Sequence, residues 1–200
     1  MTHYERFSPG SFYHIFNHAV GNDNIFRSHD NYIFFLNRYN HYLFPVFKTF
    51  AYCLMPNHFH ILVQVRDEHT LKPLISISNS EADFHKFIMQ RLSNFLNSYA
   101  KAFNKQQSRK GSLFIDYTKR KEISNDCYFS KIINYIHQNP VHHGFCKEAD
   151  EWEYSSYNSI ISINKGTKLE RNIVFDWFGG IEHFVAFHKQ HKYLESEFDF

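Results

Sequence analysis

The chain has 200 residues, of which 43% are hydrophobic, and a formal net charge of +2. This length and composition fit one globular domain with a substantial core, and they exclude a disordered tail or linker. Three cysteines lie far apart without a CxxC pair, which excludes a zinc knuckle and a disulfide framework. Because the net charge is small, any affinity for nucleic acid must come from local clusters of basic residues.

The sequence predicts neither a signal peptide nor a membrane span. The first ten residues, MTHYERFSPG, lack the apolar core of a signal peptide. No run approaches the roughly 18 apolar residues of a membrane span. We therefore expect a cytoplasmic protein with no membrane contact.

The first third of the chain predicts a strand, a helix and a hairpin. Residues 12–20 alternate as a strand and end at a Gly-Asn-Asp turn. A helix follows from Ser28, with its apolar residues on one face, and Pro45 ends it. A second strand over 49–54, a Pro-Asn turn and a third strand from Phe59 form the hairpin.

The next segments complete a recognisable order of elements. Residues 71–82 read as a loop, and a long amphipathic helix runs from Phe84 to Phe103. A short strand is predicted over Ser112–Ile115, followed by a helix capped within 124–126 that runs to Asn139-Pro140. The order β-α-β-β-α-β with an extra helix predicts an α+β, ferredoxin-like antiparallel sheet with helices on one face. The other face is then available for a functional site.

The third strand carries two histidines in an apolar setting, MPNHFHILVQV. Alternate side chains of a strand share a face, so His58 and His60 point one way while Phe59 and Ile61 point into the core. Two adjacent imidazoles can hold one cation. The chain has 15 histidines, so a packing or surface role for this pair is the alternative, and a third ligand is needed to decide.

The helix expected after residue 126 brings a tyrosine and an amide together. Its buried stripe includes Phe129 and Ile136. Tyr135 and Asn139 are four residues apart and lie on a neighbouring stripe, about a quarter-turn from the buried one. Taken alone, the tyrosine fits amphipathic packing and the Asn before a proline fits a helix end.

Four segments of the chain resemble the single-tyrosine HUH transposases, and most closely their REP-associated branch. They are YHIFNHAVGNDNIF (13–26), MPNHFHILV (55–63), GSLF followed by KRK (111–121), and YIHQNPVHHGFCKEADEWEYSSY (135–157). The resemblance covers residues 12–157 in the family's order. It implies a transposase domain over residues 1–157 and a C-terminal extension over 158–200 packed on that domain.

The resemblance also implies roles for individual residues. The family's nucleophilic tyrosine falls on Tyr135, and its third metal ligand falls on Asn139 beside His58 and His60. The implied activity is a metal-dependent transposase or endonuclease that cleaves and rejoins single-stranded DNA through a 5′-phosphotyrosine intermediate. The cofactor is expected to be Mg²⁺ or Mn²⁺, and the nitrogen-rich ligand set suits Mn²⁺. Departures occur at Asn17-His18 and in the VHHG segment after Pro140, where relatives often carry basic residues.

The expected substrate is single-stranded DNA with a hairpin, such as a REP-like palindrome, bound by a monomer or a homodimer. Tyr128 and His14 are possible assistants in catalysis, although each also fits a structural role. Basic residues expected to contact phosphates are Lys101, Lys105, Arg109, Lys110, Lys119, Arg120 and Lys121.

Two other functions fit parts of the same pattern. One is a hairpin nucleic-acid-binding protein that no longer turns over, and the intact set of four site residues argues against it. The other is a metal hydrolase that pairs the histidine strand with a carboxylate, but no acidic residue lies at a suitable spacing.

Overall fold

A four-stranded antiparallel sheet forms the centre of the computed structural model, which describes residues 4–75, 83–124 and 128–191. The strands are β1 (Phe12–His18), β2 (Phe47–Met55), β3 (His58–Val65) and β4 (Lys119–Ile123). They lie in the spatial order β2-β3-β1-β4, and every neighbouring pair is antiparallel. This arrangement confirms the predicted α+β, ferredoxin-like sheet.

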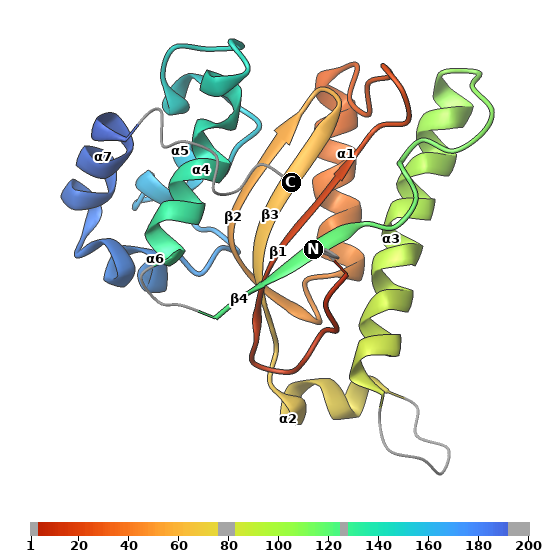
Figure 1. Ribbon diagram of the computed structural model, residues 1–200, viewed down its shortest axis with the longest axis horizontal. Helices are drawn as coiled ribbons and strands as arrows, with labels where there is room; N and C mark the ends of the chain where they lie inside the picture. The colour runs from red at the N-terminus through yellow and green to blue at the C-terminus, as the bar shows by residue number, and fades with distance from the viewer. Residues whose placement is uncertain (1–3, 76–82, 125–127, 192–200) are drawn as a thin grey trace.

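Helices cover both faces of this sheet (Figure 1), so the face that the sequence analysis expected to be open for a site is also covered. They are α1 (His29–Tyr42), α2 (Glu68–Leu71), η1 (Lys72–Leu74), α3 (Phe84–Gln106), α4 (Phe129–His142), η3 (Ala149–Glu151), α5 (Tyr157–Ile161), α6 (Arg171–Phe178) and α7 (Ile181–Gln190). The long helices α1 and α3 pack together on one face, and α4 lies on the other with the C-terminal helices around it. No helix within the described ranges is long and apolar enough to cross a membrane.

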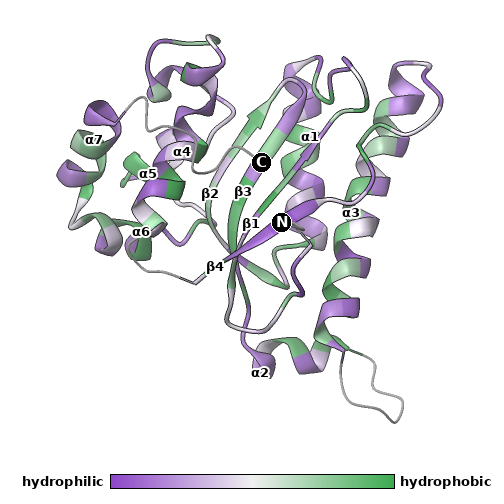
Figure 2. Ribbon diagram, viewed as in Figure 1, coloured by the Kyte–Doolittle hydropathy of each residue, from purple (hydrophilic) through white to green (hydrophobic). Residues whose placement is uncertain are grey.

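Two apolar cores follow from these two layers. One lies between the sheet and the pair α1 and α3, and includes Phe35, Phe59 and Phe95. The other lies under α4 and the C-terminal helices, and includes Leu62 and Ile133. A strand buried on both faces reads as a near-continuous apolar run. In Figure 2 the inner strands show green stretches interrupted by purple, while β4 at the edge is mostly purple.

The fourth strand is not where the sequence placed it. Residues 112–115 contain a single bridge, between Phe114 and Ala19, and the strand predicted there is wrong. The segment Lys119–Ile123, which is basic and was not predicted to be a strand, forms β4. It lies at the edge of the sheet, where charged residues are tolerated and commonly found, and it pairs with β1 apart from one isolated bridge between Arg120 and Tyr4.

Other boundaries differ by a few residues. The first strand ends at His18, and two short helices, α2 and η1, begin the segment expected to be a loop. Helix α4 continues through Pro140 to His142. Residues 125–126, expected to cap α4, lie outside the described residues, as do 76–82 of the expected loop.

The C-terminal helices hold α4 from behind through buried hydrogen bonds. The Nδ1 atom of His188 donates to the carbonyl of Phe184 at 2.8 Å, so its Nε2 accepts from Nδ1 of His137 at 2.9 Å. The Nε2 atom of His137 then accepts from the Ser156 hydroxyl at 2.7 Å. Gln138 of α4 donates to the backbone of His188 at 2.7 Å. These contacts attach α7 to α4, while the domain boundary at residue 157 remains a prediction.

Burial of this histidine pair predicts acid sensitivity. Desolvation lowers the pKa of His188 to about 4 and that of His137 well below its usual range. The unfolded chain therefore takes up protons first as the pH falls below about 6.5, and each such histidine removes roughly 2 kcal/mol of the unfolding free energy between pH 7 and pH 5. Well above pH 6.5 both histidines are neutral in the folded and the unfolded chain, so their titration no longer changes the unfolding free energy. Urea denaturation at pH 7, 6 and 5 measures the slope.

Two substitutions on α7 separate this effect from general acid unfolding. His188→Gln should lower stability at pH 7 and reduce the pH slope by about one proton. His183→Gln, at an exposed position of the same helix, is the control for removing a histidine from α7. Equal slopes in all three proteins would contradict the role given to His188.

Candidate active site

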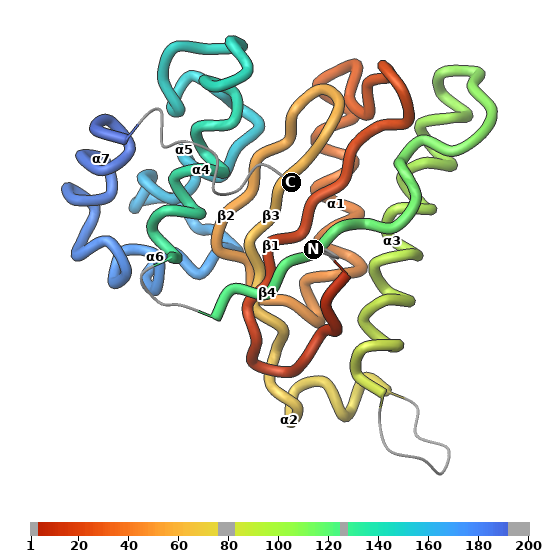
Figure 3. Tube along the Cα trace, in the orientation of Figure 1, coloured from red at the N-terminus to blue at the C-terminus, as the bar shows by residue number. Residues whose placement is uncertain are grey.

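A pocket of about 240 Å³ lies between the sheet and α4. Strand alternation and register create its floor. His58 and His60 of β3 face α4, and the antiparallel pairing places His18 opposite His58 and Phe16 opposite His60. The Cα trace in Figure 3 shows α4 beside the β2–β3 hairpin that carries this floor.

Helix α4 supplies the opposite wall. Tyr135 and Asn139 are one turn apart and both line the pocket. The Asn139 side chain donates from Nδ2 to the carbonyl of Tyr135 at 3.1 Å, which directs its Oδ1 toward Nε2 of His58, 3.3 Å away. The Tyr135 ring meets the His60 ring edge-on, with 5.5 Å between centroids. The four residues singled out in the sequence thus come together within one chain.

Burial keeps both histidines neutral. Desolvation lowers the pKa of His58 to about 4, although its contact with Asn139 acts in the opposite direction. Desolvation, followed by the neighbouring His14, lowers the pKa of His60 well below its usual range. At neutral pH each ring therefore carries one proton and one free lone pair, which is the state that binds a metal.

The hydrogen bonds of the two rings select which nitrogen carries the proton. Nδ1 of His58 lies 2.8 Å from Oδ1 of Asn57, and Nδ1 of His60 lies 2.9 Å from Nε2 of His14. When each Nδ1 donates a hydrogen bond to its partner, each Nε2 is unprotonated and has a lone pair that can bind a metal. Nε2 of His58 and Oδ1 of Asn139 then face each other as two acceptors, an arrangement that a cation between them stabilises.

The donor set is unusual in having an amide as its third member. Among the described residues, no group of three or more His, Cys, Asp or Glu side chains is arranged to hold a metal. If these side chains held a cation, two imidazoles and one amide oxygen would leave the other coordination positions to water or phosphate oxygens.

Three further histidines border this site, and two of them were not selected from the sequence. The ring of His18 stacks on that of His58 at 5.6 Å, and the ring of His143 lies 5.1 Å from it. His14 is wholly buried and contacts His60. Alternation along β1 indicates that His14, Phe16 and His18 share one face of that strand. Only the register of β1 with β3 shows that this is the face that carries the two histidines of β3. Tyr128, the other suggested assistant, is at the N-cap of α4, about 10 Å along the helix from Tyr135.

The basic segment of β4 divides between the two faces of the sheet. Lys119 and Lys121 lie on the side of the histidines, and Lys119 lines the pocket with its Nζ 5.7 Å from the Phe16 ring. Arg120 points the other way and is only 6% exposed. Its guanidinium donates to the carbonyls of Glu5, Tyr4 and Thr118. Arg120 therefore stabilises the fold, whereas the sequence predicted that it would contact a phosphate.

Arg109 is also used inside the protein. It forms an ion pair with Asp23 at 2.6 Å and donates to Asn104 and to the backbone of Ser112. These bonds hold the turn after α3. The other expected DNA contacts on α3 and this turn, Lys101, Lys105 and Lys110, are exposed.

Because Arg120 is buried and Lys121 lies on the other face of β4, replacing each by alanine should change the unfolding free energy by different amounts. Arg120→Ala removes a buried charge that bonds three carbonyls, and should lower the unfolding free energy by about 2–4 kcal/mol. Lys121→Ala should change it by less than about 0.5 kcal/mol. Urea denaturation at low and high salt measures both, and equal effects of the two substitutions would contradict the register of β4.

Comparisons with known proteins agree with the resemblance in the sequence. No family model matches the chain. It is 27% identical over 112 residues to the curated "Putative REP-associated tyrosine transposase" of Haemophilus influenzae, a match that spans 56% of this chain and 60% of the relative's length. A solved structure of a REP-associated tyrosine transposase bound to a REP hairpin shares the fold, with a TM-score of 0.58 and 14% identity over 84% of this chain and 90% of the other. The chain is thus similar to REP-associated tyrosine transposases in sequence and in fold.

Proposed function

We propose that the chain is a metal-dependent transposase or endonuclease that cleaves and rejoins single-stranded DNA beside a hairpin. One observation carries this proposal. A single pocket brings together a tyrosine, two neutral imidazoles and an amide oxygen, from a helix and a strand that are distant in sequence. The similar protein of known structure binds a REP hairpin, which suggests the form of the DNA.

The residues present fit a divalent cation. In an octahedral shell with bonds of 2.0–2.1 Å, adjacent ligands lie about 3 Å apart. Nε2 of His58 and Oδ1 of Asn139 are 3.3 Å apart, and no proton is available between them when Asn57 accepts from Nδ1. His60 would supply the third donor. When bound, the cation neutralises charge on phosphate oxygens, and either Mg²⁺ or Mn²⁺ can do so, with Mn²⁺ better suited to nitrogen ligands.

Tyr135 is the proposed nucleophile because its ring borders the same pocket as the ligands. Its phenol oxygen forms a bond to phosphorus while the bond to the 3′ oxygen breaks. The phenol loses its proton, and the leaving oxygen gains one to become a 3′-OH. Since the adduct keeps a phosphodiester, the 3′-OH can attack it and restore the strand, so one site serves both cutting and joining.

Lys119 and Lys121 support a site for phosphate. Both lie on the pocket side of the edge strand β4. A lysine near a backbone phosphate contributes affinity without reading sequence. The alternative, a hairpin-binding protein without turnover, uses the same lysines but requires no reactive tyrosine.

The ligand assignment predicts graded losses of metal binding. His58→Ala and His60→Ala should each reduce Mn²⁺ affinity at least 100-fold, because each removes an imidazole donor. Asn139→Ala should have a smaller effect, since water can replace an amide oxygen. Isothermal titration of Mn²⁺ into each variant measures the change. Unchanged affinity in both histidine variants would remove the metal from the proposal.

The nucleophile assignment predicts loss of a covalent adduct. Tyr135→Phe retains the ring and should leave stability and hairpin binding close to wild type, while cleavage disappears. Each protein is incubated with Mn²⁺ and a hairpin oligonucleotide labelled on the 3′ side of the cut, then denatured and examined for label on the protein.

Tyr128→Phe is the matched control, because it removes a hydroxyl from the same helix and should keep the adduct. An adduct that persists in Tyr135→Phe, or one attached to a 3′-phosphate, would contradict the assignment. Hairpin binding without any adduct in the wild type would favour the alternative function.

A further inference from the structure

Helix α1 presents large apolar side chains to solvent on the side of the molecule away from the candidate active site. Ile33 is 42% exposed and Phe34 is 38% exposed. Helices α1 and α3 cover one face of the sheet, whereas α4 and the Tyr135 pocket lie on the other (Figure 1). This exposed face of α1 is therefore separate from the site proposed for cleavage.

A groove of about 290 Å³ runs beside these residues, between α1 and α3. We call it the α1 groove. Its lining includes the aromatic rings of Phe34, Tyr99 and Phe103. At one end the amide of Asn31 donates to that of Gln106 at 2.7 Å, so these polar groups bond to each other. The groove thus favours an apolar side chain over a polar ligand.

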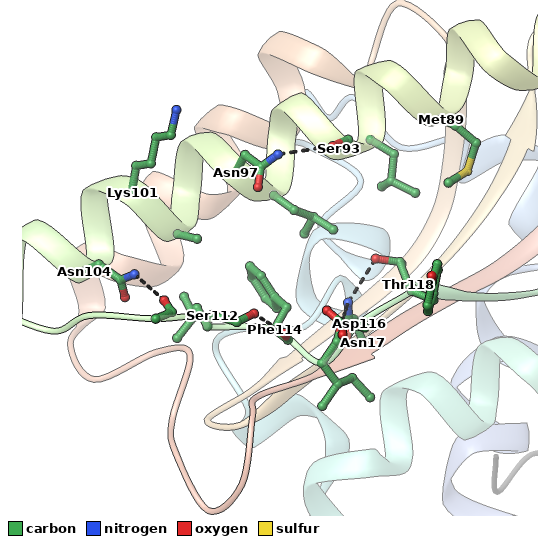
Figure 4. A pocket seen from close by; sticks show the side chains of 17 residues that line it. Asn17, Met89, Ser93, Asn97, Lys101, Asn104, Ser112, Phe114, Asp116 and Thr118 are labelled. Carbon is green, nitrogen blue, oxygen red and sulfur yellow. Dashed lines mark hydrogen bonds between the residues drawn. The ribbon is translucent and has the colours of Figure 1, made fainter.

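The other side of α3 has a different character. The hollow there lies between α3 and the segment 111–118, and Figure 4 shows polar side chains along it. Asn97 donates to the Ser93 hydroxyl at 3.1 Å, and Asn104 donates to the carbonyl of Gly111 at 2.9 Å. A partner that buries apolar surface therefore gains more at the α1 groove.

Two opposite charges flank Phe34 at equal distances along α1. Asp30 is four residues before Phe34 and Arg38 is four residues after it, so the three form one row on the helix surface, about 12 Å long. Within the described residues, no ion pair includes Asp30 or Arg38. The guanidinium of Arg38 donates to the hydroxyls of Ser98 at 3.0 Å and Tyr42 at 2.9 Å, so its charge has a fixed position.

This row of three side chains is complementary to itself when reversed. In a two-fold pair of antiparallel α1 helices, the row of one protomer lies beside the same row of its partner. Asp30 then meets the partner's Arg38, and Arg38 meets the partner's Asp30. The two Phe34 rings meet near the axis, beside both α1 grooves.

We propose that the exposed face of α1 and the α1 groove bind a second copy of the same chain, in a two-fold dimer with Phe34 at its centre and two pairs of Asp30 with Arg38. A second copy is the occupant because it supplies the matching charges in reverse order, whereas another partner would need a matching row of its own. Because α1 and α4 lie on opposite faces of the sheet, both Tyr135 pockets lie on the outer sides of this dimer.

Analytical ultracentrifugation of nuclease-treated protein measures this association without DNA. Wild type should pass from monomer to dimer with a Kd on the order of 10 μM, as expected for a small interface. Asp30→Arg and Arg38→Asp should each weaken dimerisation at least tenfold, because each substitution places two pairs of like charges across the axis.

Mixing the two variants gives the most specific measurement. In a mixed dimer of Asp30→Arg with Arg38→Asp, both pairs across the axis again have opposite charges, so the equimolar mixture should dimerise with nearly wild-type affinity. Glu182→Arg on α7 and Lys165→Asp in the loop before α6 make the same changes of charge at other exposed positions. Each of these controls should dimerise alone as wild type does.

Three results would overturn the proposal. One is a wild type that remains monomeric up to about 100 μM, tenfold above the expected Kd. Another is dimerisation of both single variants as in wild type, which would place the interface elsewhere. The third is a mixture that stays monomeric although circular dichroism shows both variants folded. Should a charge reversal prevent folding, Asp30→Asn retains the side-chain size and should weaken dimerisation severalfold, and an unchanged affinity would reject the pairing.

Discussion

Packing of α4 against β2 and β3 is the contact on which the candidate site depends. It buries His60 and most of His58 beneath the helix, and this burial is the main cause of their lowered pKa values. An exposed imidazole would be partly protonated near neutral pH and would compete poorly for a cation. The same packing brings Tyr135 and Asn139 to the rings. Helix position, ligand protonation and nucleophile placement thus have a common origin.

This contact places polar groups on both sides of α4, which an amphipathic helix does not normally require. On the sheet side Asn139 meets His58, and on the opposite side His137 and Gln138 bond to α7 and its surroundings. Buried polar groups are costly unless each finds a partner. The chain of hydrogen bonds from α7 satisfies the rear of the helix and limits its rotation. The C-terminal helices therefore have a physical role in fixing α4, even though their sequence showed no functional pattern.

The sequence was sufficient for the parts of the site that depend on local periodicity. Alternation placed His58 and His60 on one face, and four-residue spacing paired Tyr135 with Asn139, without knowledge of the strand order. It was insufficient where a side chain's environment depends on register between distant strands. The position of His18 opposite His58, and the reversal of Arg120 relative to Lys119, follow from pairing of β1 with β3 and β4.

The misplaced fourth strand has a related cause. Residues 112–115 are apolar enough to resemble a strand, whereas Lys119–Ile123 is charged and lacks the composition of one. An edge strand needs only one row of backbone hydrogen bonds, and its outward groups are solvated, so composition constrains it weakly. The apolar side chains of Leu113 and Phe114 are instead buried in the core beneath α3.

The same edge strand explains how a chain of nearly zero net charge can present a basic surface. Arg109 and Arg120 are bonded to Asp23 and to backbone carbonyls, so they contribute little outside the protein. Lys119 and Lys121 lie toward the site because the alternation of β4 separates them from Arg120. Potential near a surface depends on where unscreened charges lie within about 10 Å, rather than on the total. The register of one short strand thus determines which basic residues lie on the side of the candidate site and which stabilise the fold.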